Sequence, residues 1–151
     1  MPCGVRKGVE TVKRYSFIEH TADAEFRAYG SSLPEAFGNA ALAMCSLMYD
    51  IGAAGTSDSR TVKVGGRDLH RLLRTFLEEV HFMVETGDFL TAGFEEVGIE
   101  ESDAGFTLTA RLLGSPAPGD FRHGAGVKAV TYSEMMVEDG NSPFVQVVVD
   151  V

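Results

Sequence analysis

Acidic residues lie near both ends of this sequence, where they could together bind a metal ion. Asp23 opens an alternating segment at residues 23–30, and Asp150 closes an apolar segment at residues 144–151. If these segments pair as neighbouring strands, the two carboxylates and the α-carboxylate of Val151 come together. Oxygen ligands suit hard cations such as Ca²⁺, Mg²⁺ or Mn²⁺, whereas zinc prefers nitrogen and sulfur.

A plainer interpretation fits the same residues. Asp23 could cap the start of a strand, and Asp150 could be a solvated residue at the end of the chain. Spacing alone favours this interpretation, because two distant acids are weak evidence for a site. His20 is similarly ambiguous: it could act as a general base or a metal ligand, or it could bond to the backbone of a turn.

Lys128 lies in a segment, residues 127–137, whose pattern predicts one strand. Alternation would place Lys128, Tyr132 and Glu134 on the same face of that strand. Lys128 could then bind an anion or pair with an acid near the metal. It could equally be an edge lysine with a buried stem.

Other side chains offer little chemistry. His70 and His81 lie about three helical turns apart and cannot share one metal, so we expect both at the surface. Cys3 and Cys45 do not supply the four ligands of a structural zinc site. The sequence contains no phosphate-binding loop, serine nucleophile elbow or cysteine–histidine protease pattern. It therefore gives no positive indication of an enzyme.

Length and composition indicate one globular domain. The chain has 151 residues, of which 44% are hydrophobic and 23% charged. Its 13 basic and 22 acidic residues give a net charge of −9, which argues against a broad nucleic-acid surface and favours a basic protein partner. No apolar run reaches the roughly 20 residues of a membrane helix. Residues 1–14 resemble a variable leader rather than a secretory signal, so we expect a cytoplasmic protein.

Hydrophobic periodicity predicts two helices among several strands. Ser32 and Glu35 form a capping box before the first helix, whose apolar stripe runs to Met48. Asp68 caps a second helix, which Gly87 ends. Strands are predicted at residues 15–19, 23–30, 61–64, 94–100, 106–113, 127–137 and 144–151. This order predicts an α+β fold, with two helices packed on a largely antiparallel β-sheet in a single domain.

Three motifs follow one another along the chain: Glu19-His20-Thr21-Ala22-Asp23, Lys128-Ala129-Val130-Thr131-Tyr132 and Asp150-Val151. In this order they resemble the archease family. The stretch at 36–50, which closes on Asp50, also matches, and the resemblance covers a domain at residues 15–151. Ser133 stands where the family pattern has histidine, and Ala24-Glu25 replaces an aliphatic–glycine pair, but neither departure removes a metal ligand.

The resemblance implies a non-catalytic cofactor protein. It implies that the protein activates an RtcB-type tRNA-splicing RNA ligase by promoting guanylylation and multiple turnover of the ligase. The resemblance implies metal ligands at Asp23, Asp150 and Val151, with Ca²⁺ as the expected cofactor and Mg²⁺ or Mn²⁺ as alternatives. His20, Asp50 and Lys128 match further functional positions. The expected partner is the ligase, without strong direct binding to nucleic acid and without a membrane.

Three alternatives stay open. The family has also been associated with a tRNA cytosine methyltransferase, which it would modulate as a chaperone, and a general chaperone is a plainer version of the same idea. The third alternative is a small metal-dependent hydrolase, with His20 as base beside a cation held by Asp23 and Asp150. The sequence offers no oxyanion donor or substrate pocket for a hydrolase, so the ligase activator is the preferred hypothesis.

Overall fold

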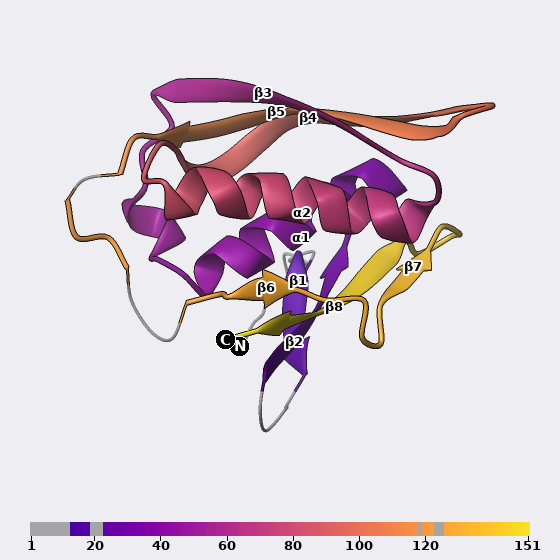
Figure 1. The fold of residues 1–151 in the computed structure, drawn as a ribbon, viewed down its shortest axis with the longest axis horizontal. Coiled ribbons are helices and arrows are strands. Elements are labelled where there is room, and N and C mark those ends of the chain that lie inside the picture. Colours follow the sequence, from indigo (N-terminus) through magenta and orange to yellow (C-terminus); the bar gives the residue numbers. More distant parts are fainter. Residues whose placement is uncertain (1–12, 19–22, 118, 123–125) are drawn as a thin grey trace, which may run out of the picture.

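Two antiparallel sheets enclose a layer of two helices (Figure 1). The computed structural model describes residues 13–18, 23–117, 119–122 and 126–151. Most of the predicted leader therefore lies outside the described residues. The α+β class, the two helices and the antiparallel pairing are confirmed, but the strands are divided between two sheets instead of forming one.

The larger sheet contains the strands that carry the predicted metal ligands. Its strand order is β1-β2-β8-β6, and β7 also pairs with β8. The bounds are β1 (Tyr15–Ile18), β2 (Asp23–Tyr29), β6 (Ala129–Val130), β7 (Met136–Glu138) and β8 (Phe144–Asp150). The smaller sheet has the order β3-β5-β4, with β3 (Asp58–Gly66), β4 (Leu90–Ser102) and β5 (Gly105–Ser115).

Helix α1 (Leu33–Ser46) explains why two sheets are needed. Nearly all its residues are buried, because it contacts β2 and β8 on one side and β4 on the other. A helix that is apolar around its whole circumference must be covered on both sides. Its N-cap is as predicted, since the Ser32 hydroxyl accepts from the Glu35 amide at 3.3 Å, but Glu35 bonds back to the residue before the cap. The Glu35 carboxylate accepts from the Ser31 amide at 2.6 Å.

Helix α2 (Leu69–Glu85) has one buried face and one open face. Asp68 caps its start, because the Asp68 carboxylate accepts from the Arg71 amide at 2.8 Å. At the other end, the Thr86 hydroxyl donates to the carbonyl of Phe82 at 3.0 Å. Gly87 follows with a φ of 71°, a left-handed conformation that suits glycine and ends the helix as predicted. A short 3-10 helix, η1 (Ile51–Ala53), follows α1.

The segment at 127–137 differs from the prediction of one strand. It forms β6 and β7, separated by a turn at residues 131–135. The Thr131 hydroxyl donates to the Val148 carbonyl at 2.9 Å and accepts from the Ser133 amide at 3.2 Å. Glu134 has a φ of 51°. The chain turns here, and the Met135 amide donates to the Tyr132 carbonyl at 3.2 Å. Lys128, Tyr132 and Glu134 therefore do not share one strand face.

The core lies between the two sheets and around both helices. Its fully buried aromatic and aliphatic side chains include Phe26, Phe37, Phe76, Leu108 and Val147. None of the helices in the described ranges is long and apolar enough to cross a membrane.

Candidate metal site where β2 meets β8

The two predicted acidic ligands face each other across neighbouring strands. Strands β2 and β8 pair antiparallel, and Asp23 is the direct partner of Asp150 in their register. The pairing of these strands, which the sequence required for a site, is confirmed. Directly opposed residues in an antiparallel pair have Cβ atoms about 5 Å apart and point to the same face. The register therefore places both side chains opposite each other on the same face of the sheet.

The electrostatics of this pair favour a cation. Like charges placed directly opposite each other destabilise a strand pair. Asp23 is half-buried, whereas Asp150 is exposed. A divalent cation between the two carboxylates would replace their repulsion by attraction, and carboxylate oxygens are the donors that Ca²⁺ and Mg²⁺ prefer.

Lys128 and Val151 lie next to Asp150. The Lys128 amide donates to the Asp150 carbonyl at 2.7 Å, and Ala129 on β6 pairs with Asp150 from the side opposite to β2. Asp150 therefore lies between β2 and β6. Val151 is half-buried and packs against the core, which fixes the end of β8. Because Asp23 is also the register partner of Asp150, all three archease-like motifs meet at this one residue.

The donor set fits a hard metal ion only in part. Within the described ranges, no three side chains of His, Cys, Asp or Glu surround a common point. A metal at Asp23 and Asp150 would therefore need other oxygen donors, and the Val151 α-carboxylate is the one that the sequence suggests. Metal binding by these three residues stays a prediction.

The other expected positions differ in their outcome. His20 lies outside the described residues. Asp50 is exposed, and its carboxylate accepts from the Gly52 amide at 3.1 Å, so it caps η1. It lines a hollow of about 450 Å³ together with Tyr15 and Tyr49. Asp50 does not complete a three-residue ligand group with Asp23 and Asp150 within the described part of the chain.

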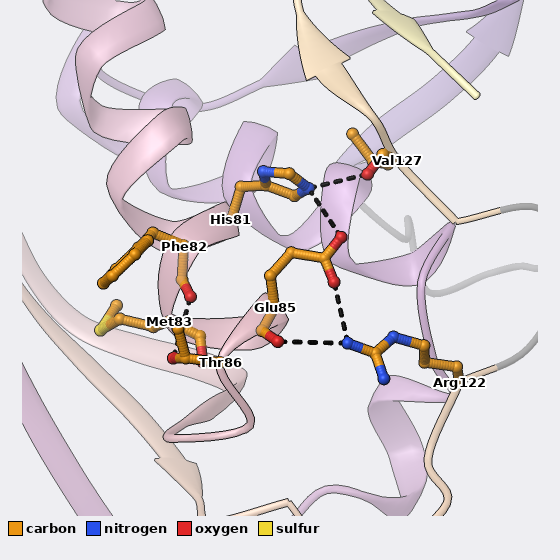
Figure 2. Close-up of polar contacts among 7 residues, drawn as sticks. All are labelled: His81, Phe82, Met83, Glu85, Thr86, Arg122 and Val127. Carbon is orange, nitrogen blue, oxygen red and sulfur yellow. Dashed lines mark hydrogen bonds and ion pairs between the residues drawn. The ribbon is translucent and has the colours of Figure 1, made fainter.

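One polar cluster near the site was not foreseen from the sequence. Figure 2 shows His81 and Glu85 on α2 facing Arg122 and Val127 from the connection between β5 and β6. His70 is exposed as expected, but the side chain of His81 is only 17% exposed. Helical spacing gives the side of α2 on which His81 lies, but not the segment that packs over it.

Cys45 is a buried thiol that is poorly suited to a metal or redox site. It lies in α1 and is fully buried, and burial raises the pKa of its thiol to about 12. A thiol in such surroundings stays protonated and is neither a good nucleophile nor a good ligand. The expectation that Cys45 is a small core residue is confirmed.

Comparison with known proteins assigns the family. The profile of the Archease protein family (MTH1598/TM1083) matches residues 15–151. The chain belongs to the archease family. The archease of Methanosarcina acetivorans is 34% identical over 141 residues, which cover 92% of this chain and 97% of that protein. The archease of Pyrococcus abyssi is 36% identical over 128 residues, covering 84% of this chain and 89% of the relative.

A solved structure supports the same assignment. The solution structure of protein 1598 from Methanobacterium thermoautotrophicum superposes with a TM-score of 0.77 at 31% sequence identity. The match covers 93% of this chain and all of that one. The two-sheet arrangement is therefore the archease fold, and the family expected from the three motifs is confirmed.

Proposed function

We propose that this archease is a metal-dependent activator of an RtcB-type tRNA-splicing RNA ligase, which promotes guanylylation and multiple turnover of the ligase. Its place in the archease family supports a role in tRNA processing. Asp23, Asp150 and the Val151 α-carboxylate would hold Ca²⁺, or alternatively Mg²⁺ or Mn²⁺. When bound, the cation would neutralise the acidic end of the β2–β8 pair.

The single observation that carries this proposal is the register of β2 and β8. It brings Asp23 from the first motif directly opposite Asp150 from the last one. Because a one-residue shift would turn one of these carboxylates to the other sheet face, the alignment depends on the register of all seven residue pairs between the strands. The Lys128 amide, from the second motif, contacts the same residue.

The partner is proposed to be a protein with a basic contact surface. The net charge of −9 disfavours broad contact with RNA phosphates but favours association with a positively charged protein. In this proposal the archease has no nucleophile of its own, and the ligase carries out the covalent chemistry. The site of action would be the cytoplasm, where tRNA processing enzymes could meet it.

The test is multiple-turnover RNA joining by the cognate ligase with GTP and a divalent metal. Substoichiometric archease should raise the number of turnovers per ligase. Asp23→Asn and Asp150→Asn keep the side-chain shape but remove one charge each, and both should abolish the stimulation. Glu138→Gln, at an exposed position on β7, is the matched control and should stimulate like the wild type.

The same assay separates the alternatives. Stimulation that survives in both aspartate variants would remove the metal from the proposal. A lack of stimulation by the wild type would favour the chaperone of a tRNA cytosine methyltransferase, for which methylation specificity is the measurement. The hydrolase hypothesis depends on His20, which the structure does not describe, and metal-dependent turnover of phosphoester or peptide substrates would be needed to support it.

A further inference from the structure

Helix α2 is tied to the segment that leads into the candidate metal site. The Nε2 atom of His81 lies 2.7 Å from the carbonyl oxygen of Val127 and 3.4 Å from a carboxylate oxygen of Glu85 (Figure 2). Both neighbours are acceptors, so Nε2 must carry a hydrogen and donate. The ring therefore fixes the position of the Val127 carbonyl relative to α2.

Arg122 closes the cluster from the other side. Its Nη2 atom donates to a Glu85 carboxylate oxygen at 2.9 Å and to the Glu85 backbone carbonyl at 3.2 Å. The second contact satisfies a carbonyl in the last turn of α2 and brings a cation to the helix C-terminus, where positive charge is favourable. Glu85 thus bridges His81 and Arg122, and each of the three side chains orients the next.

The next residue along the chain connects this cluster to Asp150. Val127 is only 3% exposed, so its side chain is also held by the core. The amide of the following residue, Lys128, donates to the Asp150 carbonyl at 2.7 Å. One peptide unit, Val127–Lys128, therefore makes both the hydrogen bond to α2 and the hydrogen bond to β8. The orientation of that unit depends on both bonds.

We infer that His81 is a positioning residue for the metal site, and that Glu85 and Arg122 support it. We call these three side chains the clasp. By holding the Val127–Lys128 peptide against Asp150, the clasp fixes the end of β8 and thereby the direction of the Asp150 carboxylate. The clasp touches no proposed ligand side chain. This inference rests on the proposed metal site at Asp23 and Asp150. Removal of groups that orient ligands in other metal sites costs about 10–100-fold in metal affinity.

His81→Leu and His81→Gln form the decisive pair of variants. Leucine removes the donor, whereas the glutamine amide can still donate to the Val127 carbonyl. We expect Ca²⁺ binding, measured by titration calorimetry, to weaken about 10–100-fold in His81→Leu and to stay close to wild type in His81→Gln. His70→Leu, on the exposed first turn of the same helix, is the control for loss of a histidine and should bind Ca²⁺ normally.

Amide hydrogen exchange measured by NMR gives a second readout that does not need the metal. The Lys128 amide should exchange faster in His81→Leu than in the wild type or His81→Gln, because its hydrogen bond to Asp150 is no longer held from α2. If His81→Leu does not fold, Glu85→Gln at a side chain 41% exposed carries the same test. Weaker Ca²⁺ binding and faster exchange at Lys128 in that variant would support the inference.

The two readouts distinguish the inference from the proposed function. Unchanged Lys128 exchange and unchanged Ca²⁺ affinity in His81→Leu, or in its substitute Glu85→Gln, would overturn the positioning role. Failure of the wild type to bind Ca²⁺, or equal binding by Asp23→Asn, would overturn the metal site instead. In that event the exchange rate of the Lys128 amide alone shows whether the clasp holds the Val127–Lys128 peptide in place.

Discussion

Asp150 makes contacts from both sides at the end of β8. It faces Asp23 on β2 and accepts the Lys128 amide from the segment before β6. Strand patterns placed Asp23 and Asp150 at strand ends, but the pairing of their strands was an assumption that the register now confirms. The sequence was not sufficient to predict the contact of His81 with Val127, since a loop contact over a helix leaves no periodic signal.

The opposed carboxylates predict that Asp150→Asn has opposite effects with and without metal. In EDTA the variant should be as stable as the wild type or more stable by about 0.5 kcal/mol, because a like-charge pair is removed. In millimolar Ca²⁺ the wild type should gain thermal stability through preferential binding to the folded state, whereas the variant should not. Thermal unfolding in both buffers measures this, and an equal Ca²⁺-induced rise in Tm would contradict the metal site.

Cys45 is predicted to be unreactive in the native protein. Its pKa of about 12 and its full burial leave almost no accessible thiolate at pH 8. Iodoacetamide should therefore not alkylate Cys45 until the protein is unfolded. Peptide mapping by mass spectrometry after labelling with and without guanidinium makes the comparison, and rapid labelling of native Cys45 would show that α1 opens readily.

At the scale of elements, the start of α1 depends on two serines and one glutamate. Ser32→Ala removes the hydroxyl that accepts from the Glu35 amide, and it should cost about 1 kcal/mol of stability. Urea unfolding gives the free energy. Ser57→Ala, at an exposed position outside the helices, is the control and should change stability by less than about 0.5 kcal/mol. An equal loss in both variants would remove the cap as the cause.

Glu35 makes the same helix start sensitive to acid. Hydrogen bonds from the Ser31 amide and hydroxyl lower the pKa of the Glu35 carboxyl below its ordinary value of 4.5. A lowered pKa stabilises the fold above the unfolded value, and this contribution is lost as the pH falls through the folded value. Glu35→Gln should therefore be less stable than the wild type at pH 7, with the difference shrinking towards pH 3. A pH-independent difference in urea unfolding would contradict this cause.

The helices and most strands followed from sequence patterns, but their division into sheets did not. Ser32, Asp68 and Gly87 mark helix ends by local chemistry, so those ends were predictable. The turn within residues 131–135 was missed because apolar and β-branched residues stand on both sides of Ser133 and Glu134, without a glycine or proline to mark it. The strand breaks at Glu134, which has a φ of 51° and whose carbonyl accepts from the Gln146 side-chain amide at 2.8 Å, a contact that joins distant parts of the chain.

At the scale of the whole molecule, net charge should govern association with the proposed ligase. A charge of −9 on a small domain creates a negative field that steers a basic partner at low ionic strength. The association rate should therefore fall steeply as NaCl is raised from 50 to about 500 mM, because the Debye length shortens. Stopped-flow or surface-based binding kinetics measure this. A rate that does not depend on salt would point to an apolar contact.

The two sheets differ in how far apart their strands lie along the chain. Strands β3, β4 and β5 are consecutive with α2, whereas β8 must find β2 across almost the entire sequence. Closing so long a loop is slow, so the β3–β5–β4 sheet with α2 can form before the β2–β8 pair. A cation that joins Asp23 to Asp150 would then act after the rate-limiting step. It would prolong the lifetime of the native state by slowing unfolding, while the refolding rate stays unchanged.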